Sequence, residues 1–199
     1  MGYDKALLPW GETDLLGHAI ARLRAAVVEV AILSGAEPRY ADRGLRVVAD
    51  RVPDDGPIAG LESGLEHAAG RPVLLLAVDL PLVPLSLLCG LAERLAGWDA
   101  VVPLSPGGPE PLCAAYGPAC LPAIRARVAA GQRTMTAFWP DVRVRALPPP
   151  ELVRFGEPET MFLNVNEPDD LARAVTVAAH TGGLGSARHP PGRKSRRRT

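Results

Sequence analysis

The sequence of 199 residues lacks most features that would assign it to a specialised class of protein. Its three cysteines are an odd number without a CxxC pair, so neither a disulfide framework nor a zinc knuckle is expected. The four histidines are scattered without metal-ligand spacing. The longest apolar run matches one strand, well short of the roughly 20 residues that span a membrane. The first residues contain early charges instead of an apolar signal-peptide core. We therefore expect a cytoplasmic protein without a membrane segment.

The best-known motifs for nucleotide binding and for covalent catalysis are also missing. No GxGxxG follows a strand-like run and no GxxxxGK[ST] occurs, so neither a Rossmann dinucleotide site nor a P-loop is supported. No convincing Ser/His/Asp or Cys/His set is present. Catalysis through a nucleophilic side chain is therefore not predicted.

Lysine is nearly absent. Only Lys5 and Lys194 occur, against twenty arginines. A lysine retained in such a background weakly indicates that a compact point charge is needed at position 5. An ordinary surface lysine is the alternative interpretation.

Basic residues are concentrated at the end of the chain. Residues 180–199 contain six Lys or Arg and no acidic residue, so we expect a basic, disordered tail. Residues 1–179 hold sixteen basic against twenty-two acidic side chains, which argues against a nucleic-acid binder. We expect one domain over 1–179, large enough to bury a single core. Binding of RNA or another anion by the tail is the alternative.

Hydrophobic periodicity predicts alternating helices and strands. The predicted helices cover residues 12–26, 57–68, 84–95, 118–131 and 167–179, and the predicted strands cover residues 27–33, 45–50, 72–78, 99–104, 111–118, 142–147 and 161–166. Thr13 is the expected cap of the first helix, and Pro57 suits the first turn of the second.

This order predicts an α/β fold with βαβ units, in which helices cover both faces of a mostly parallel sheet. Residues 72–78, "PVLLLAV", are apolar on both faces, as in a central parallel strand. Residues 111–118, "PLCAAYGP", are expected to form an edge strand.

Asp79 stands where the most apolar predicted strand ends, in "VLLLAVDLPLVP". In open α/β sheets, ligands bind beyond the carboxyl ends of the strands. A carboxylate there is costly to desolvate unless a positive partner joins it, which could be an Arg or Lys, backbone amides or Mg²⁺. The alternative is that Asp79 caps the turn that follows it.

Two asparagines alternate along the predicted strand in "FLNVNEPDDL". Asn166 also fits the N-cap of the following helix, which is the stronger interpretation from spacing alone. Asn164 has no such structural role. An asparagine at a strand end can offer its carbonyl oxygen to a metal or its amide to an oxyanion.

Glycines recur in "DDGPIAGLESG" at positions 56, 60 and 64. Gly56, Gly60 and Gly64 would let the backbone approach a flat ligand closely. A loop followed by a helix with small packing residues is the alternative.

Taken together, these segments resemble the molybdenum cofactor guanylyltransferase family, the MobA-like nucleotidyltransferases with a GT-A-type, nucleotide-diphospho-sugar-transferase-like fold. The matching segments follow the order of the family from residue 1 to about 175, and they are "MGYDKALLPWG", "DDGPIAGLESGL", "AVDLPLVPLSLL", "PLCAAYGPACLPAIRARVAAGQRTMTAFW" and "FLNVNEPDDLARA". Each motif is moderately specific, and the ordered set is strong.

The resemblance implies transfer of GMP from GTP to the terminal phosphate of the molybdopterin cofactor, with release of pyrophosphate and with Mg²⁺ as cofactor. It makes Lys5, which would neutralise the triphosphate, and Asp79, which would hold Mg²⁺, the candidate catalytic residues. Molybdoenzyme chaperones are further candidate partners.

The same resemblance assigns the binding of the substrates. Asp50, Gly56 and Gly60 would contact base and ribose. Asn164 and Asn166 would line the opposite side, near the metal or the pterin phosphate.

The sequence departs from the family at its start. The family normally begins with a strand and a Gly-rich loop, roughly "LAGGxSxRMG", and "MGYDK" matches only the end of that loop. We expect in-frame coding sequence upstream to encode an apolar strand followed by "AGG" and an arginine, and a truly truncated gene is the alternative. A cytidylyltransferase of the same cofactor and a non-catalytic nucleotide-binding module remain the alternative functions.

Overall fold

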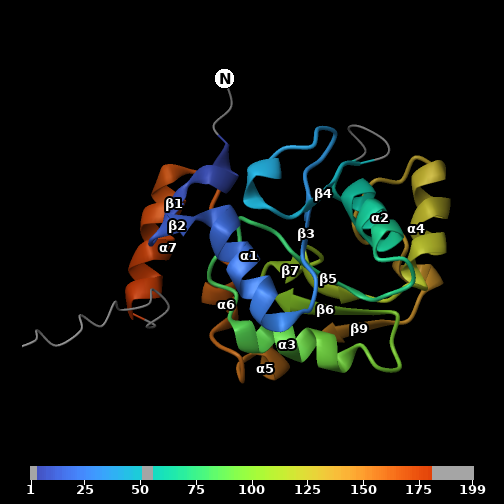
Figure 1. The fold of residues 1–199 in the computed structure, drawn as a ribbon. Coiled ribbons are helices and arrows are strands. Elements are labelled where there is room, and N and C mark those ends of the chain that lie inside the picture. The colour runs from blue at the N-terminus through green and yellow to red at the C-terminus, as the bar shows by residue number, and fades with distance from the viewer. Residues whose placement is uncertain (1–3, 51–55, 181–199) are drawn as a thin grey trace, which may run out of the picture.

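The computed structural model describes residues 4–50 and 56–180 of the chain (Figure 1). The helices are α1 (Leu15–Ala26), α2 (Pro57–His67), α3 (Leu85–Arg94), α4 (Cys120–Ala129), α5 (Pro149–Leu152), α6 (Pro158–Met161) and α7 (Pro168–His180), with 3-10 turns η1 (Lys5–Leu7), η2 (Ala41–Arg43) and η3 (Trp139–Asp141). The strands are β1 (Pro9–Trp10), β2 (Thr13–Asp14), β3 (Ala31–Leu33), β4 (Arg46–Val48), β5 (Val73–Leu76), β6 (Ala100–Ser105), β7 (Gly108–Pro109), β8 (Cys113–Tyr116) and β9 (Val144–Leu147).

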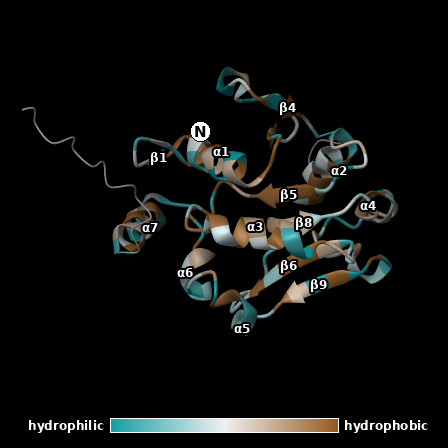
Figure 2. Ribbon diagram, turned by 60° about the horizontal axis from the view of Figure 1, so that its bottom comes forward, coloured by the Kyte–Doolittle hydropathy of each residue, from teal (hydrophilic) through white to brown (hydrophobic). Residues whose placement is uncertain are grey.

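The main sheet has the order β5-β8-β6-β7, with β9 on the other side of β6 (Figure 2). Because β8 is antiparallel to both β5 and β6, and β9 is parallel to β6, the strands β5, β6 and β9 run in one direction. β3 and β4 form a separate parallel pair. The α/β class is confirmed, but the sheet is mixed, because the short β6–β7–β8 connection reverses the chain without a crossover helix.

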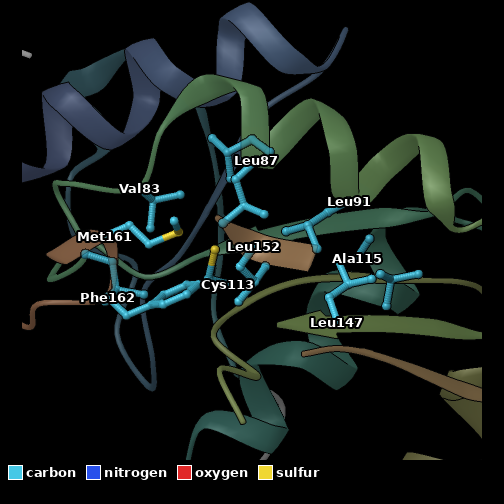
Figure 3. Packing of buried hydrophobic residues seen from close by; sticks show 12 residues of the cluster. Val83, Leu87, Leu91, Cys113, Ala115, Leu147, Leu152, Met161 and Phe162 are labelled. Carbon is cyan, nitrogen blue, oxygen red and sulfur yellow. The ribbon is translucent and has the colours of Figure 1, made fainter. Parts of the chain in front are cut away.

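Helices cover both faces of the main sheet, as the alternating side chains require. On one face Leu74 and Leu76 join the core cluster of α3, whose packing Figure 3 shows. On the other face Val73 and Leu75 join the cluster under α2 and α4. The predicted three-layer arrangement is therefore present.

Two strands occupy places other than those predicted. β5, expected at the centre of a parallel sheet, is the outermost strand of the main sheet, and each of its four residues is only half-buried. β8, expected at an edge, lies between β5 and β6 with all four residues buried. Its small residues, Cys113, Ala114 and Ala115, fit between two helical layers. The sequence of a strand does not show whether it lies in the middle or at the edge of a sheet.

Two local predictions are also corrected. Residues 161–166 form no strand: Met161 ends α6, and the segment continues to α7 without regular structure. Asp14, not Thr13, caps α1, because Asp14 directly precedes the helix and its carboxylate accepts from the Gly17 amide at 2.7 Å. An anionic cap also complements the helix dipole, so aspartate is at least as good a cap as threonine.

The predicted tail, residues 180–199, lies outside the described residues apart from His180, which ends α7. Within residues 4–50 and 56–180, no helix combines the length and the apolar character that crossing a membrane requires.

Candidate active site

Three polar side chains from distant parts of the sequence meet beyond the carboxyl end of β5. Lys5 Nζ donates to Asp79 Oδ2 and to Asn166 Oδ1, each at 2.9 Å. The Asp79 side chain is 17% exposed and that of Lys5 is 42% exposed, so the ion pair is partly shielded from water but remains reachable. We name Lys5, Asp79 and Asn166 the polar cluster. Of the partners considered for Asp79, the structure supplies a lysine.

The backbone around the polar cluster holds its members in place. Asp4 caps η1 by accepting from the Ala6 amide at 3.1 Å, and the Ala6 side chain is buried. The Val165 amide donates to Asp79 O at 2.9 Å, and the Val165 side chain is fully buried. Each polar side chain is therefore adjacent in sequence to an anchored residue.

Asn166 does not use its side-chain carbonyl to cap α7. That oxygen accepts from Lys5, while Asp170 Oδ2 accepts from the backbone amides of Asn166 and Glu167 at 3.1 and 3.2 Å. Because Asp170 binds the two backbone amides that precede α7, the Asn166 side chain is available to the site.

Asn164 is not part of the polar cluster. Its side chain is exposed, and it makes no hydrogen bond to the described residues. The alternation that placed it beside Asn166 depended on a strand that the structure does not contain.

Asp50, Gly56 and Gly60 line a cavity of about 730 Å³ that also reaches Asp79. Gly56 has φ +72°, a conformation that favours glycine, and it leads directly into α2. A Cβ built on Gly60 would lie 3.5 Å from Asp50 Oδ1, an ordinary contact. Gly64 instead packs against Leu33, where an added Cβ would lie 3.3 Å from Cδ1, so its small size serves packing.

Asp50 is electrostatically unusual. Burial raises the pKa of its carboxyl above the ordinary range. Its Oδ1 atom is buried and has no hydrogen-bond partner within the part of the chain that the structure describes. A buried acceptor without a donor costs free energy, so this atom is suited to accept a hydrogen bond from a ligand.

Two groups beside the polar cluster were not predicted from the sequence. Glu110 precedes β8, and the pairing of Leu76 with Cys113 brings this end of β8 to the carboxyl end of β5. Burial raises the pKa of Glu110, a hydrogen bond from Ser105 lowers it, and the charge of Asp79 raises it. The antiparallel direction of β8 was the missing information, since a parallel edge strand would begin at the opposite end of the sheet.

The second group holds Asp4, the residue before Lys5. The Tyr40 hydroxyl donates to Asp4 at 2.9 Å, and Arg39 lies 3.5 Å from the same carboxylate. Burial, and then the hydrogen bond to Asp4, raise the pKa of Tyr40. No local pattern in the sequence links these residues.

The donor set suits a hard divalent ion that shares its coordination with a phosphorylated ligand. Among the described residues, no three or more His, Cys, Asp or Glu side chains are grouped so that they could hold a metal ion by themselves. Asp79 offers a carboxylate, Asn166 an amide oxygen and Glu110 a second carboxylate nearby. Mg²⁺ is typically held by one or two carboxylates together with substrate phosphates and water, so these residues fit it.

Residues 1–144 match the family model described as the MobA-like NTP transferase domain. The chain belongs to this family. Its members are nucleotidyltransferases, and the family assignment confirms the resemblance and the enzyme class predicted from the sequence.

Curated members of the MobA-like NTP transferase family cover most of the chain. The probable molybdenum cofactor guanylyltransferase of Carboxydothermus hydrogenoformans is 32% identical over 177 residues, 89% of each chain. The molybdenum cofactor guanylyltransferase of Cereibacter sphaeroides is 38% identical over 184 residues, 88% of this chain and 89% of its own.

Solved structures support the fold. The molybdopterin-guanine dinucleotide biosynthesis protein A of Archaeoglobus fulgidus superposes with a TM-score of 0.76 at 23% identity, covering 90% of this chain and 92% of its own. The 2-C-methyl-D-erythritol 4-phosphate cytidylyltransferase of Thermus thermophilus gives 0.66 at 20% identity, covering 88% and 94%. At these identities the likeness concerns the fold alone.

Proposed function

We propose that this chain transfers GMP from GTP to the terminal phosphate of the molybdopterin cofactor, forming the guanine dinucleotide cofactor and pyrophosphate. The observation that carries the proposal is the polar cluster at the carboxyl end of β5, in a chain whose curated relatives are named guanylyltransferases. A nucleotidyltransferase needs mainly to position two phosphates and neutralise their charge, and this cluster has the groups for that task.

The reaction needs no nucleophilic side chain. An oxygen of the cofactor phosphate attacks the α-phosphorus of GTP, and a new P–O bond forms there. The bond between that phosphorus and the oxygen bridging to the β-phosphorus breaks, and its electrons leave with pyrophosphate. Negative charge develops on the transferred group and on the leaving group, so a positive environment accelerates the step.

Lys5 has two assigned tasks. In the free protein it compensates the charge of Asp79 across 2.9 Å. When nucleotide arrives, its partly exposed ammonium group neutralises the triphosphate, as a compact point charge with three donors can. Asn166, which accepts from Lys5, orients the ammonium group and lines the side on which the cofactor phosphate enters.

Asp79 is the residue that would hold Mg²⁺, and the carbonyl of Asn166, which shares the Lys5 ammonium group with Asp79, would offer a further oxygen. The ion would supply charge neutralisation at the phosphates. Two contacts orient Asp79. Its carboxylate accepts a hydrogen bond from Lys5, and its backbone carbonyl accepts one from the Val165 amide.

Asp50 and the glycine turn before α2 are assigned to base and ribose. The unsatisfied Oδ1 of Asp50 accepts from a donor group of the nucleoside. Gly56 and Gly60 line the cavity without a side chain, which leaves the backbone accessible to a flat base. Asn164, exposed and outside the polar cluster, is retained only as a contact to the larger cofactor substrate. A cytoplasmic location, where GTP is available, remains part of the proposal.

A coupled pyrophosphate-release assay with Mg²⁺ and molybdopterin tests the proposed reaction. GTP and CTP are compared at equal concentrations, with reactions lacking the cofactor as the blank. We expect cofactor-dependent release that is faster with GTP. Faster release with CTP would assign the chain to the cytidylyl reaction, and nucleotide binding without any release would identify a non-catalytic module.

A further inference from the structure

A neighbouring loop holds the residue that directly precedes Lys5. This loop, residues 34–45, connects β3 to β4 and contains η2, which lies beside the start of the described chain (Figure 1). The Tyr40 hydroxyl donates to the Asp4 carboxylate and lies 3.0 and 2.9 Å from its two oxygens. Arg39 lies 3.5 Å from Asp4 Oδ2. Two consecutive residues of the loop therefore bind one carboxylate next to the polar cluster.

The same loop holds the chain at a second point beyond Lys5. Arg43 of η2 binds both carboxylate oxygens of Asp14, the residue that caps α1. Residues 4–14 are thus attached to the loop at each end, and Lys5 lies inside the attached segment. Fixing both ends of a short segment removes most of the conformations open to it. The backbone of Lys5 is therefore restrained from both sides.

The backbone of Tyr40 has a conformation that aromatic residues seldom adopt. Its φ of +67° and ψ of +28° lie in the left-handed region, which favours glycine. Such a conformation persists only where the surroundings determine it, and it is common at functional sites. Glycine would fit the backbone better but would lack two contacts. The Tyr40 ring packs against the core cluster that contains Ala6, and its hydroxyl binds Asp4.

Both carboxylate oxygens of Asp4 have donors among the described residues. Oδ1 accepts from the Ala6 amide at 3.1 Å and from Tyr40, and Oδ2 also accepts from Tyr40. A carboxylate one residue away would otherwise compete for the Lys5 ammonium group, because opposite charges at short range attract each other. With these donors in place, Lys5 is directed to the other two members of the polar cluster, at 2.9 Å from each.

A lysine in this position needs a fixed backbone. Its ammonium group sits on a long, flexible stem, and 42% of the Lys5 side chain is exposed, so packing around the stem restrains it only in part. The ammonium group keeps its place between Asp79 and Asn166 because the backbone beneath it is held. Catalysis depends on such placement, since a displacement of about 1 Å can lower a rate by about 100-fold.

We propose that Tyr40 is a positioning residue for the nucleotidyl transfer and that it places the Lys5 ammonium group through Asp4. Arg39 supports Tyr40 by sharing the Asp4 carboxylate. Tyr40 acts on the reaction only through Lys5 and makes no contact with the reacting phosphates. The inference rests on the proposed function for its effect on turnover, whereas the placement of Lys5 can be measured without any substrate.

Isotope labelling of lysine alone makes the placement of Lys5 observable by NMR. The chain contains only Lys5 and Lys194, so labels at Cε and Nζ give two sets of signals. We expect Tyr40→Phe, which keeps the ring, to lower the order parameter of the Lys5 Cε group towards its value in Asp79→Ala. Tyr116→Phe is the matched control. It also removes a tyrosine hydrogen bond, one of 2.7 Å to a backbone carbonyl, and should leave that order parameter unchanged.

A double-mutant cycle on pyrophosphate release connects Tyr40 with Lys5 in the reaction. Tyr40→Phe should lower kcat/KM for GTP by roughly tenfold in the wild-type background but by less than about twofold in Lys5→Gln, because the lost placement matters only when the ammonium group is present. If Tyr40→Phe fails to fold, the exposed substitution Arg39→Gln replaces it, with a smaller expected loss in both measurements.

The two measurements separate the inference from the proposed function. An unchanged Lys5 order parameter in Tyr40→Phe, or equal losses of kcat/KM in the two backgrounds, would overturn the inference. A lower order parameter in Tyr40→Phe, with no turnover in the wild type, would support the placement of Lys5 by Tyr40 and refute the proposed function instead.

Discussion

At the scale of single residues, we propose that the chemistry depends on one ammonium group between a carboxylate and an amide oxygen. Lys5 contacts both Asp79 and Asn166 at 2.9 Å. Lys5→Gln keeps a donor but removes the charge, so we expect kcat/KM for GTP to fall by roughly 100-fold. The matched control, Lys194→Gln, should retain wild-type turnover. Steady-state pyrophosphate release measures both, and wild-type kinetics in Lys5→Gln would remove this lysine from the mechanism.

We expect the Asp50 carboxylate to lower the stability of the fold and to strengthen GTP binding. Burial raises the pKa of Asp50 in the folded protein, so the fold favours the protonated carboxyl. The stability from the protonated form is fully present below the unfolded pKa of about 3.9 and is lost as pH rises through the folded pKa. Asp50→Asn should therefore raise Tm at pH 7 and weaken GTP binding, and the gain in Tm should shrink at pH 3.5. Calorimetric melting at the two pH values measures this. A lower Tm for the variant at pH 7 would show that the carboxylate is stabilising.

At the scale of elements, α2 and α4 are joined by a shielded ion pair. Arg125 of α4 lies 3.2 Å from Glu62 of α2, whose side chain is 11% exposed, and 2.7 Å from Glu66. Arg125→Ala leaves Glu62 without this cation, and we expect the free energy of unfolding to fall by about 1–3 kcal/mol. Arg127→Ala breaks an exposed pair with Asp141, which water screens, and should lower the free energy of unfolding by less. Urea unfolding of both variants compares the two costs, and equal losses would argue against a special role for the α2–α4 pair.

Elements that depend on neighbouring residues could be predicted from the sequence, whereas those that depend on distant residues could not. α2, α3 and α4 were predicted nearly to their ends because proline and the apolar period are local signals. The positions of β5 and β8 in the sheet were not, because strand order depends on pairing between residues about 40 apart in the sequence. The strand predicted over residues 161–166 was wrong for the same reason. Val165 is held by a hydrogen bond to Asp79 O and not by pairing with a neighbouring strand.

At the scale of the whole molecule, the fold brings residues 5, 79 and 166 together beyond the carboxyl end of β5. The end of β5 identified Asp79 from sequence alone, because its position follows from a single strand. The partners of Asp79 came from the family resemblance, since the 74 and 161 residues that separate Lys5 from Asp79 and Asn166 leave no local pattern. Glu110 was missed because its approach to Asp79 requires the antiparallel register of β8.

Calorimetric titration of the wild-type chain with GTP, with and without Mg²⁺, tests the central claim most directly. Asp79→Asn serves as the site variant and Asp99→Asn as the matched control, since Asp99 pairs with Arg143 just before β6, at the amino end of the strands that run parallel to β5. The account predicts that Mg²⁺ strengthens GTP binding in the wild type and in Asp99→Asn, and that Asp79→Asn loses this Mg²⁺-dependent gain, roughly tenfold or more in Kd. The same Mg²⁺-dependent affinity in all three proteins would contradict it.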